Sequence, residues 1–306
     1  MAHRWYTIFI RTAVAAFLLA GCRQEQQYTP VASLTTQEVA STIEFLGHDL
    51  LEGRAPGTRG GELAEIYLKS MFQQLEIASY KGSYFQPFTL KGYAMRDLTA
   101  IVGGKRVAYP AEIVGSYPRD RSAFSLTSEA VFCGYGITSA PWQWNDYKEA
   151  DVKGKIVIVR VNEPGRDNPD LFKGKALTYY GRWTYKIEEA ARRGAKGVLL
   201  VHTKETAGYG WHVVENSWGG EELYLPETLE NELAFRGWIK EEVLSRILMD
   251  KGYSMAELNK TSESPDFSPV PLDLGVQLKG RNTFRRFTTR NVVGVIPGSD
   301  SDLKEK

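Results

Sequence analysis

The sequence predicts an α/β (α+β) fold, because strand and helix patterns follow one another in the middle of the chain. Residues 152–159 form an almost continuous β-branched run after a glycine turn, which is typical of a strand buried on both faces. Residues 186–193 are helix formers with one apolar face, and Gly194 stands where a left-handed helix cap belongs. Residues 197–201 form a second apolar strand. The stretch predicts a βαβ-like unit with a long insertion between its first strand and its helix.

Length and composition limit the function classes. The 306 residues suffice for one large domain or two smaller ones. A hydrophobic fraction of 42% and a charged fraction of 25% are those of an ordinary soluble globular protein. The formal net charge of +1 gives no reason to expect nucleic acid or an acidic surface as a partner. The 7 Trp and 16 Tyr are compatible with a surface that contacts carbohydrate or peptide, and equally with core packing.

The N-terminus has the features of an export signal. Arg4 and Arg11 give it positive charge, and residues 12–20 are an apolar run too short to span a membrane. The run ends in Leu-Ala-Gly-Cys at residues 19–22, which resembles the bacterial lipoprotein box and implies lipid attachment at Cys22. The alternative is a plain signal peptide with an incidental cysteine. We therefore expect a signal peptide over residues 1–21.

The second cysteine and the polar segment after the signal complete this picture. Residues 22–34 begin with a polar run and predict a disordered tether. Cys133 is the only other cysteine, so lipid on Cys22 would leave it without an intrachain partner. Cys133 lies in an apolar run with no histidine near it in sequence, which favours a buried inert thiol over a nucleophile.

The first folded segment predicts two helices joined by a glycine-rich loop. Thr36 is a plausible N-cap for a first helix, and residues 48–61 form the loop. Residues 62–75 predict the second helix, with a buried apolar stripe. A phosphate-cradling loop is disfavoured, because the Lys-Ser/Thr pair of a P-loop is missing and no strand precedes the glycines.

The later elements follow from periodicity. Residues 84–90 and 98–102 predict two strands, and residues 235–249 predict an amphipathic helix. Residues 262–271 are rich in proline and serine and predict a boundary loop. The basic run 281–290 favours a solvated strand over a nucleic-acid patch, since the chain as a whole is neutral.

Four segments together resemble a known domain. In order and spacing, they are similar to a protease-associated domain, in the version that is inserted into zinc aminopeptidases of the family that also holds glutamate carboxypeptidase-type enzymes. The four segments are residues 134–137, 146–147, 151–157 and 190–198. Residues 181–186 resemble a subgroup of exported bacterial aminopeptidases, and residues 290–298 resemble the strand by which that family returns to its catalytic domain.

The resemblance implies a domain organisation. It implies a protease-associated domain, an open β-barrel or sheet with flanking helices, inserted in an incomplete α/β zinc-peptidase domain. Residues 35–99 would be the N-terminal part of the peptidase domain, residues 100–270 the insertion, and residues 271–306 the return strand. Helix 62–75 and strand 292–296 would then expose their apolar faces, whereas the insertion would hold its own core.

The resemblance also implies a function. The family hydrolyses N-terminal residues of peptides with two zinc ions, held by a His-x-Asp pair, a Glu-Glu pair, a further carboxylate and a final His. The first Glu of the Glu-Glu pair is the general base. No such residues follow the strand at 290–298 before Lys306. We therefore assign no catalytic or metal residue, and expect the chain alone to bind no zinc and to be inactive.

Possible rim residues of the substrate cleft come from two places. Arg54, Gly57 and Thr58 match the family's loop before its first long helix, although a structural turn capped by Thr58 explains them as well. Arg182 and Trp183 could contact peptide, although the aromatic residues of this segment could instead close the insertion's own core.

The histidines do not predict a metal site. His48 and Asp49 are adjacent and point to different faces, and His202 and His212 have no carboxylate or cysteine cluster beside them.

Two functions remain open at this point. The first is the N-terminal portion of an exported zinc-dependent aminopeptidase. The second is a non-catalytic envelope lipoprotein that binds peptide or a protein partner through its protease-associated domain. For both, the expected partners are peptide and, through the lipid anchor, a membrane, with no nucleic acid. We expect the periplasmic side of the bacterial cell envelope, at the outer membrane. The oligomeric state does not follow from the sequence.

Overall fold

The computed structural model describes residues 35–229 and 233–303. The predicted signal peptide, the tether and Cys22 lie outside the described residues. The chain divides into two compact units, with the boundary between Tyr67 and Leu68, and each is described by itself.

The first unit contains two helices and a turn. They are α2 (Thr36–Gly47), the 3₁₀ turn η1 (Asp49–Arg54) and the first half of α3 (Arg59–Gln74). The N-cap of α2 is Thr35 rather than Thr36, because Thr35 has the extended backbone of a cap. Thr35 and Glu38 form a reciprocal capping box, with the Glu38 amide donating to Thr35 Oγ1 over 3.2 Å.

Helix α3 begins three residues earlier than predicted, at Arg59. Thr58 is its N-cap, since Oγ1 of Thr58 accepts from the amide of Gly61 at 3.2 Å and donates to the carbonyl of Ala55 at 2.7 Å. Gly60 is required here, because a Cβ atom at this position would lie 1.7 Å from the carbonyl oxygen of Leu51. The glycines thus bring η1 against the start of the helix.

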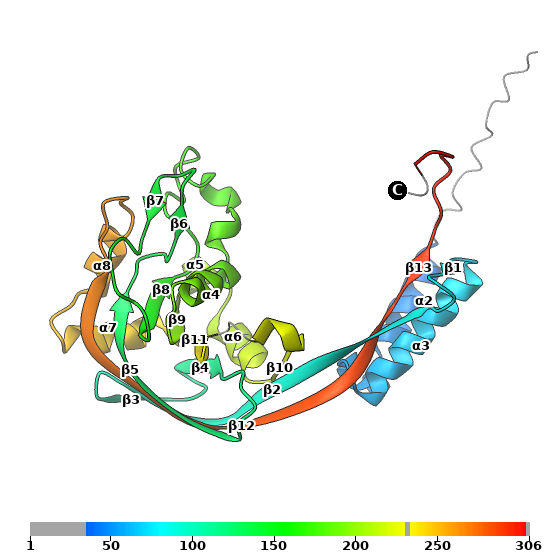
Figure 1. The fold of residues 1–306 in the computed structure, drawn as a ribbon, viewed down its shortest axis with the longest axis horizontal. Coiled ribbons are helices and arrows are strands. Elements are labelled where there is room, and N and C mark those ends of the chain that lie inside the picture. Colours follow the sequence, from blue (N-terminus) through cyan, green and yellow to red (C-terminus); the bar gives the residue numbers. More distant parts are fainter. Residues whose placement is uncertain (1–34, 230–232, 304–306) are drawn as a thin grey trace, which may run out of the picture. The chain divides into compact units, whose positions relative to one another are not determined.

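The second unit is built on a nine-stranded mixed sheet (Figure 1). The strand order is β10-β2-β12-β5-β8-β9-β11-β4, with β3 paired to β2. The strands of this sheet are β2 (Phe85–Val102), β3 (Lys105–Val107), β4 (Ile113–Ser116), β5 (Ala123–Phe132), β8 (Ile156–Arg160), β9 (Gly197–His202), β10 (Glu221–Tyr224), β11 (Phe235–Lys240) and β12 (Val270–Val292). Smaller pairs are β1 (Ala78–Ser79) with β13 (Gly294–Val295) and β6 (Thr138–Ser139) with β7 (Trp144–Asn145).

Helices cover the sheet. They are α4 (Trp183–Arg192), α5 (Lys204–Ala207), α6 (Trp211–Trp218), α7 (Glu241–Met249) and α8 (Met255–Thr261). Three 3₁₀ turns, η2 (Gly174–Ala176), η3 (Tyr179–Gly181) and η4 (Pro226–Leu229), complete the unit.

The predicted βαβ unit is confirmed as β8, α4 and β9. The two strands are parallel neighbours, with Ile156 paired to Gly197. Strand β8 begins at Ile156 rather than Val152, because Gly154 lies in a turn with φ of 72°. Gly194 has the predicted left-handed conformation after α4, also with φ of 72°.

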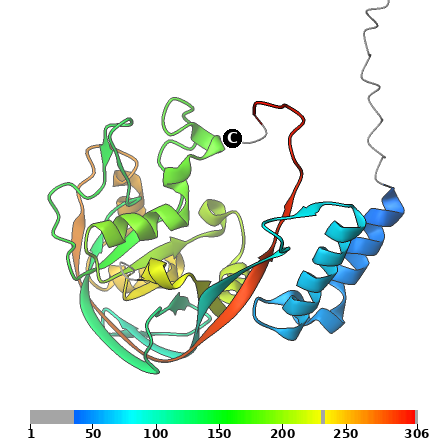
Figure 2. The ribbon, with the colours of Figure 1, turned by 45° about the vertical axis from the view of Figure 1, so that its right-hand side comes forward.

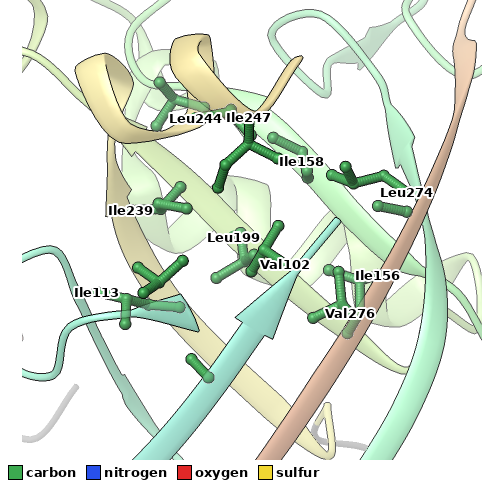
Figure 3. Packing of buried hydrophobic residues seen from close by; sticks show 14 of the residues in the cluster. Val102, Ile113, Ile156, Ile158, Leu199, Ile239, Leu244, Ile247, Leu274 and Val276 are labelled. Carbon is green, nitrogen blue, oxygen red and sulfur yellow. The ribbon is translucent and has the colours of Figure 1, made fainter. Parts of the chain in front are cut away.

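Strands β8 and β9 are buried on both faces, as the apolar run of β8 predicted. Along β8, Ile156 and Ile158 belong to one apolar cluster and Val157 and Val159 to another. Helices α7 and α8 pack on the first cluster, and α4 and α6 on the second. Figure 3 shows the first cluster, with Leu244 and Ile247 of α7 above the sheet residues.

The predicted helix over residues 235–249 is wrong in its first half. Residues 235–240 form β11, which lies between β9 and β4, and only α7 is helical. A short apolar run fits either a buried strand or a helix, and the neighbouring strands decide it in favour of the strand.

Strands β2 and β12 form a long antiparallel ribbon. They pair from Phe85 with Val292 to Val102 with Val276, so the two strands predicted within residues 84–102 are one. Figures 1 and 2 both show them side by side. The basic run 281–290 lies in β12 and is a strand, as predicted. The chain therefore enters and leaves most of this unit through adjacent strands.

The predicted exposure of the apolar faces of helix 62–75 and strand 292–296 is met only in part, since Ala64 is buried and Met71 and Phe72 are half-buried. Leu75 is 64% exposed and Ile296 is 80% exposed. The strand predicted over residues 290–298 ends β12 and then continues only as the two-residue β13. In the part of the chain that the structure describes, no helix is both long and apolar enough to cross a membrane.

Candidate functional site

A cleft lies where parallel strands end. Strands β5, β8, β9 and β11 are parallel neighbours, so their carboxyl ends share one edge of the sheet. Ligands of open α/β sheets bind outside such an edge. A cavity of about 360 Å³ is found there, lined by residues that follow β5, β8 and β9 and by Glu263, which follows α8.

Arg160, at the end of β8, is the centre of the cleft's fixed polar framework. Its guanidinium carbon lies 4.3 Å from the centroid of the Tyr135 ring. Nη1 donates to Ser262 Oγ at 2.8 Å and to Glu263 Oε1 at 2.9 Å. The Tyr135 hydroxyl donates to the same Glu263 oxygen, and burial raises the pKa of this phenol. The framework ties the β5 and β8 ends to the segment after α8.

Glu163 is the buried acid of the cleft. It is 2% exposed, and its two oxygens accept from the amide of Thr178 at 2.7 Å and the hydroxyl of Thr178 at 2.6 Å. Each carboxylate oxygen has a second acceptor site, which these two bonds do not use. The acid is therefore held in place while it retains acceptor capacity.

Two oppositely charged side chains near the cleft, Lys186 and Asp146, are buried. Lys186 is fully buried, and its Nζ donates to the carbonyl of Tyr180 at 2.6 Å. Burial lowers the pKa of Lys186, and the charges of Asp146 and Glu163 oppose that shift. Burial raises the pKa of Asp146, which accepts from the Ile137 amide at 3.0 Å and from Trp144 Nε1 at 2.8 Å. Neither residue lines the cavity.

Exposed charged residues form the rim. Arg166, Lys175 and Glu205 all line the cavity and are exposed. Arg166 Nη1 donates to the backbone carbonyl of Glu205 at 3.0 Å, which joins the loop after β8 to α5. The rim thus carries both signs of charge.

The five predicted rim residues fall in both units. Arg54, Gly57 and Thr58 belong to the first unit, where Thr58 caps α3 and Gly57 has φ of 69°. Arg182 and Trp183 belong to the second unit. Arg182 is exposed before α4, and the Trp183 ring lies 5.6 Å edge-on from that of Trp218.

None of the five lines the 360 Å³ cavity, and their contact with peptide stays a prediction. The aromatic residues before α4 differ in their exposure to solvent. Tyr180 packs against a small buried cluster that includes Phe172 and Tyr185, whereas Tyr179 is exposed.

The sequence reasoning did not single out the cleft residues. Arg160 is the last residue of the apolar strand β8 and Glu163 follows it closely, and polar residues at that position are a weak signal in parallel sheets. Glu263 comes from a distant loop, and nothing in its local sequence connects it to Arg160.

The described residues do not fit a zinc site. Over residues 35–229 and 233–303, no group of three or more His, Cys, Asp and Glu side chains could hold a metal ion. His48 Nδ1 accepts from the Leu50 amide at 3.2 Å, and His202 Nε2 lies 3.1 Å from the Tyr209 carbonyl. We derive no metal chemistry from them.

Comparison with known proteins identifies one domain. The PA domain family model matches residues 123–229, from the start of β5 to the end of η4. No curated protein sequence matches the chain.

Two solved structures are similar at low sequence identity. An aminopeptidase from Aneurinibacillus sp. strain AM-1 is 17% identical, with a TM-score of 0.42 over 85% of this chain and 48% of that one. The present chain thus spans about half the length of the aminopeptidase. A psychrophilic subtilisin-like protease from the Antarctic psychrotroph Pseudoalteromonas sp. AS-11 is 11% identical, with a TM-score of 0.30 over 64% of this chain and 36% of that one. What the comparisons establish is that residues 123–229 are a PA domain within a mixed α/β fold.

Proposed function

We propose that this chain is part of an exported zinc-dependent metallopeptidase, an aminopeptidase that removes N-terminal residues from peptides. In this proposal the chain supplies export through residues 1–21, a lipid anchor at Cys22 and a PA domain that shapes access to substrate. In this proposal, the residues that hold the two zinc ions and carry out catalysis lie outside residues 1–306. The proposed location is the periplasmic side of the cell envelope, at the outer membrane.

The observation that carries the proposal is the way the PA domain is attached. In the sequence, residues 123–229 lie between β2 and β12. At the far end of the ribbon that these two strands form, Phe85 pairs with Val292. At that end β1 pairs with β13, and Leu75 and Ile296 are largely exposed. In the proposal, a further domain covers these side chains. The part of the second unit between Phe85 and Val292, here called the lobe, is therefore suited to border a site on a domain that packs at this end of the ribbon.

The test uses the gene product with the coding sequence that follows Lys306. We expect it to hydrolyse aminoacyl-4-nitroanilides, to lose that activity with 1,10-phenanthroline, and to recover it when zinc is restored. N-acetylated substrate is the matched control and should not be hydrolysed. The 306-residue chain alone should be inactive and contain no stoichiometric zinc. Absence of a chelator-sensitive activity in the longer product would overturn the proposal.

A second candidate function is favoured by the cleft itself. The fixed and exposed charges around Arg160 could bind peptide without any metal, as an envelope lipoprotein would require. A stop codon directly after Lys306, together with peptide binding by this chain, would favour the binding protein over the enzyme.

A further inference from the structure

We propose that the cleft at the carboxyl ends of β5, β8 and β9 binds a small zwitterion, namely a free amino acid or a dipeptide, through its ammonium and carboxylate groups. The inference deepens the proposed function and rests on it for the source of the ligand, since an aminopeptidase releases free amino acids. The binding chemistry itself depends only on residues of this chain.

The cavity has the size and position of a small-molecule site. Its volume of about 360 Å³ lies in the range of ligand pockets, which begins near 300 Å³. It lies at the edge of the parallel strands where ligands of such sheets bind. Arg160 stands at the end of β8 and Glu163 follows it closely, whereas Arg166 and Lys175 come from the segment after β8 and Glu205 from α5.

Arg160 provides a fixed donor for a carboxylate. Its side chain is 13% exposed, and Nη1 is fully engaged by Asn259, Ser262 and Glu263. Among the described residues, Nε and Nη2 of Arg160 have no hydrogen-bond partner. These two donors form one side of the guanidinium fork, which matches the two oxygens of a carboxylate. The cation–π contact with Tyr135 and the bonds made by Nη1 restrain the guanidinium before a ligand arrives.

Two carboxylates provide acceptors for an ammonium group. Glu163 is held by Thr178 and keeps one acceptor site on each oxygen. The side chain of Glu205 is exposed at the rim and has no hydrogen-bond or ion-pair partner in the part of the chain that the structure describes. An ammonium group carries three donors, so it can use acceptors from both residues.

The charge balance of the cavity selects the class of ligand. Three cationic side chains, Arg160, Arg166 and Lys175, face three carboxylates, Glu163, Glu205 and Glu263. A phosphate or another polyanion would meet as many like charges as opposite ones. A ligand with one positive and one negative group satisfies both sides, which favours an unblocked amino acid or dipeptide.

The experiment is calorimetric titration of the chain carrying Cys22→Ser with leucine, glycyl-leucine, N-acetyl-leucine, leucinamide and inorganic phosphate. We expect leucine or glycyl-leucine to bind at least about tenfold more tightly than either singly blocked compound, since each blocked form loses one ionic contact. Tighter binding of leucine would identify the ligand as a free amino acid, and tighter binding of glycyl-leucine would identify it as a dipeptide. Equal binding of the blocked forms, tighter binding of phosphate, or no binding of either unblocked ligand would overturn the inference.

Rim variants locate the binding in this cleft. Arg166→Gln and Glu205→Gln should each weaken the unblocked ligand about tenfold, because each removes one charge that faces the cavity. The matched controls are Arg106→Gln and Glu149→Gln, which change exposed residues of the same unit that do not line this cavity. Equal losses in the controls would contradict the assignment.

The two proposals fail separately. Hydrolysis by the longer gene product without binding by this chain would sink the zwitterion site alone. Binding without chelator-sensitive hydrolysis would sink the peptidase alone.

Discussion

The guanidinium carbon of Arg160 lies 4.3 Å from the ring centroid of Tyr135, and both residues also bond to Glu263. The contact joins the ends of two parallel strands to a loop that comes about a hundred residues later. It makes the floor of the cleft a single connected group.

Replacing Arg160 should therefore destabilise the second unit. A lysine at this position cannot keep the contact with the Tyr135 ring and the bonds to Asn259, Ser262 and Glu263 together. We expect Arg160→Lys to lower the free energy of unfolding by about 2 kcal/mol, as for loss of charged hydrogen bonds at a largely buried group. Urea titration followed by tryptophan fluorescence measures it. The control Arg106→Lys, at an exposed arginine, should stay within about 0.5 kcal/mol of the wild type. Equal effects in the two variants would contradict the role of Arg160.

Two glycines with similar backbone conformation should respond differently to alanine. Gly136 has φ of 62° and Gly154 has φ of 72°. At Gly136 a Cβ atom would lie 2.7 Å from Val159 Cγ1, whereas at Gly154 it would meet no described atom within 4 Å. Gly154→Ala should cost about 1 kcal/mol for the left-handed backbone alone. Gly136→Ala should cost about 1–3 kcal/mol more for the overlap in the core. Thermal and urea unfolding compare them, and equal losses would refute the packing argument.

The stability of the second unit should depend on pH through His202. Burial lowers the pKa of this imidazole below the ordinary 6.5. The unfolded chain then binds the proton at a higher pH than the folded chain does. The stability from the neutral imidazole is thus present above about pH 6.5 and is lost as pH falls through the folded pKa.

The measurement for His202 is urea unfolding at pH 7.5 and pH 5.0. We expect His202→Phe to reduce the fall in unfolding free energy between these pH values. His212→Gln, which changes an exposed histidine, should leave the fall as in the wild type. An unchanged pH dependence in His202→Phe would exclude this residue as the cause.

Cys133 should be unreactive in the folded chain. Its side chain is fully buried, and burial raises the pKa of the thiol, so the reactive thiolate is scarce. We expect iodoacetamide at pH 8 to label Cys133 at least about 100-fold more slowly in buffer than in denaturing urea, because labelling requires opening of the core. Mass spectrometry of the peptide that contains Cys133 separates it from Cys22. Similar rates in both conditions would show that the thiol is accessible.

The sequence predicted the central elements because their apolar patterns are local. In β8, alternate residues enter the two apolar clusters, and the β-branched run at Ile156 already indicates burial on both faces. Gly194 was recognisable because a left-handed cap requires glycine. The predictions were wrong where the secondary structure depends on neighbouring strands. Residues 235–240 form a strand only because β9 and β4 lie on either side.

The spacing of residues in the sequence does not predict the cleft. Arg160, Tyr135 and Glu263 come together only through the parallel order of β5 and β8 and the packing of α8 on the sheet. Glu163 follows an apolar strand closely, which is a weak positional signal. The predicted residues Arg182 and Trp183 were chosen by resemblance, and the structure places them outside this cavity.

Because Phe85 and Val292 are direct partners across the β2–β12 ribbon, the backbone crosses into the lobe and back again about 5 Å apart. A tight turn could bridge that gap without stretching the strands on either side. The residues between Phe85 and Val292 therefore leave and rejoin the rest of the chain at neighbouring points, which is the geometry of an insertion.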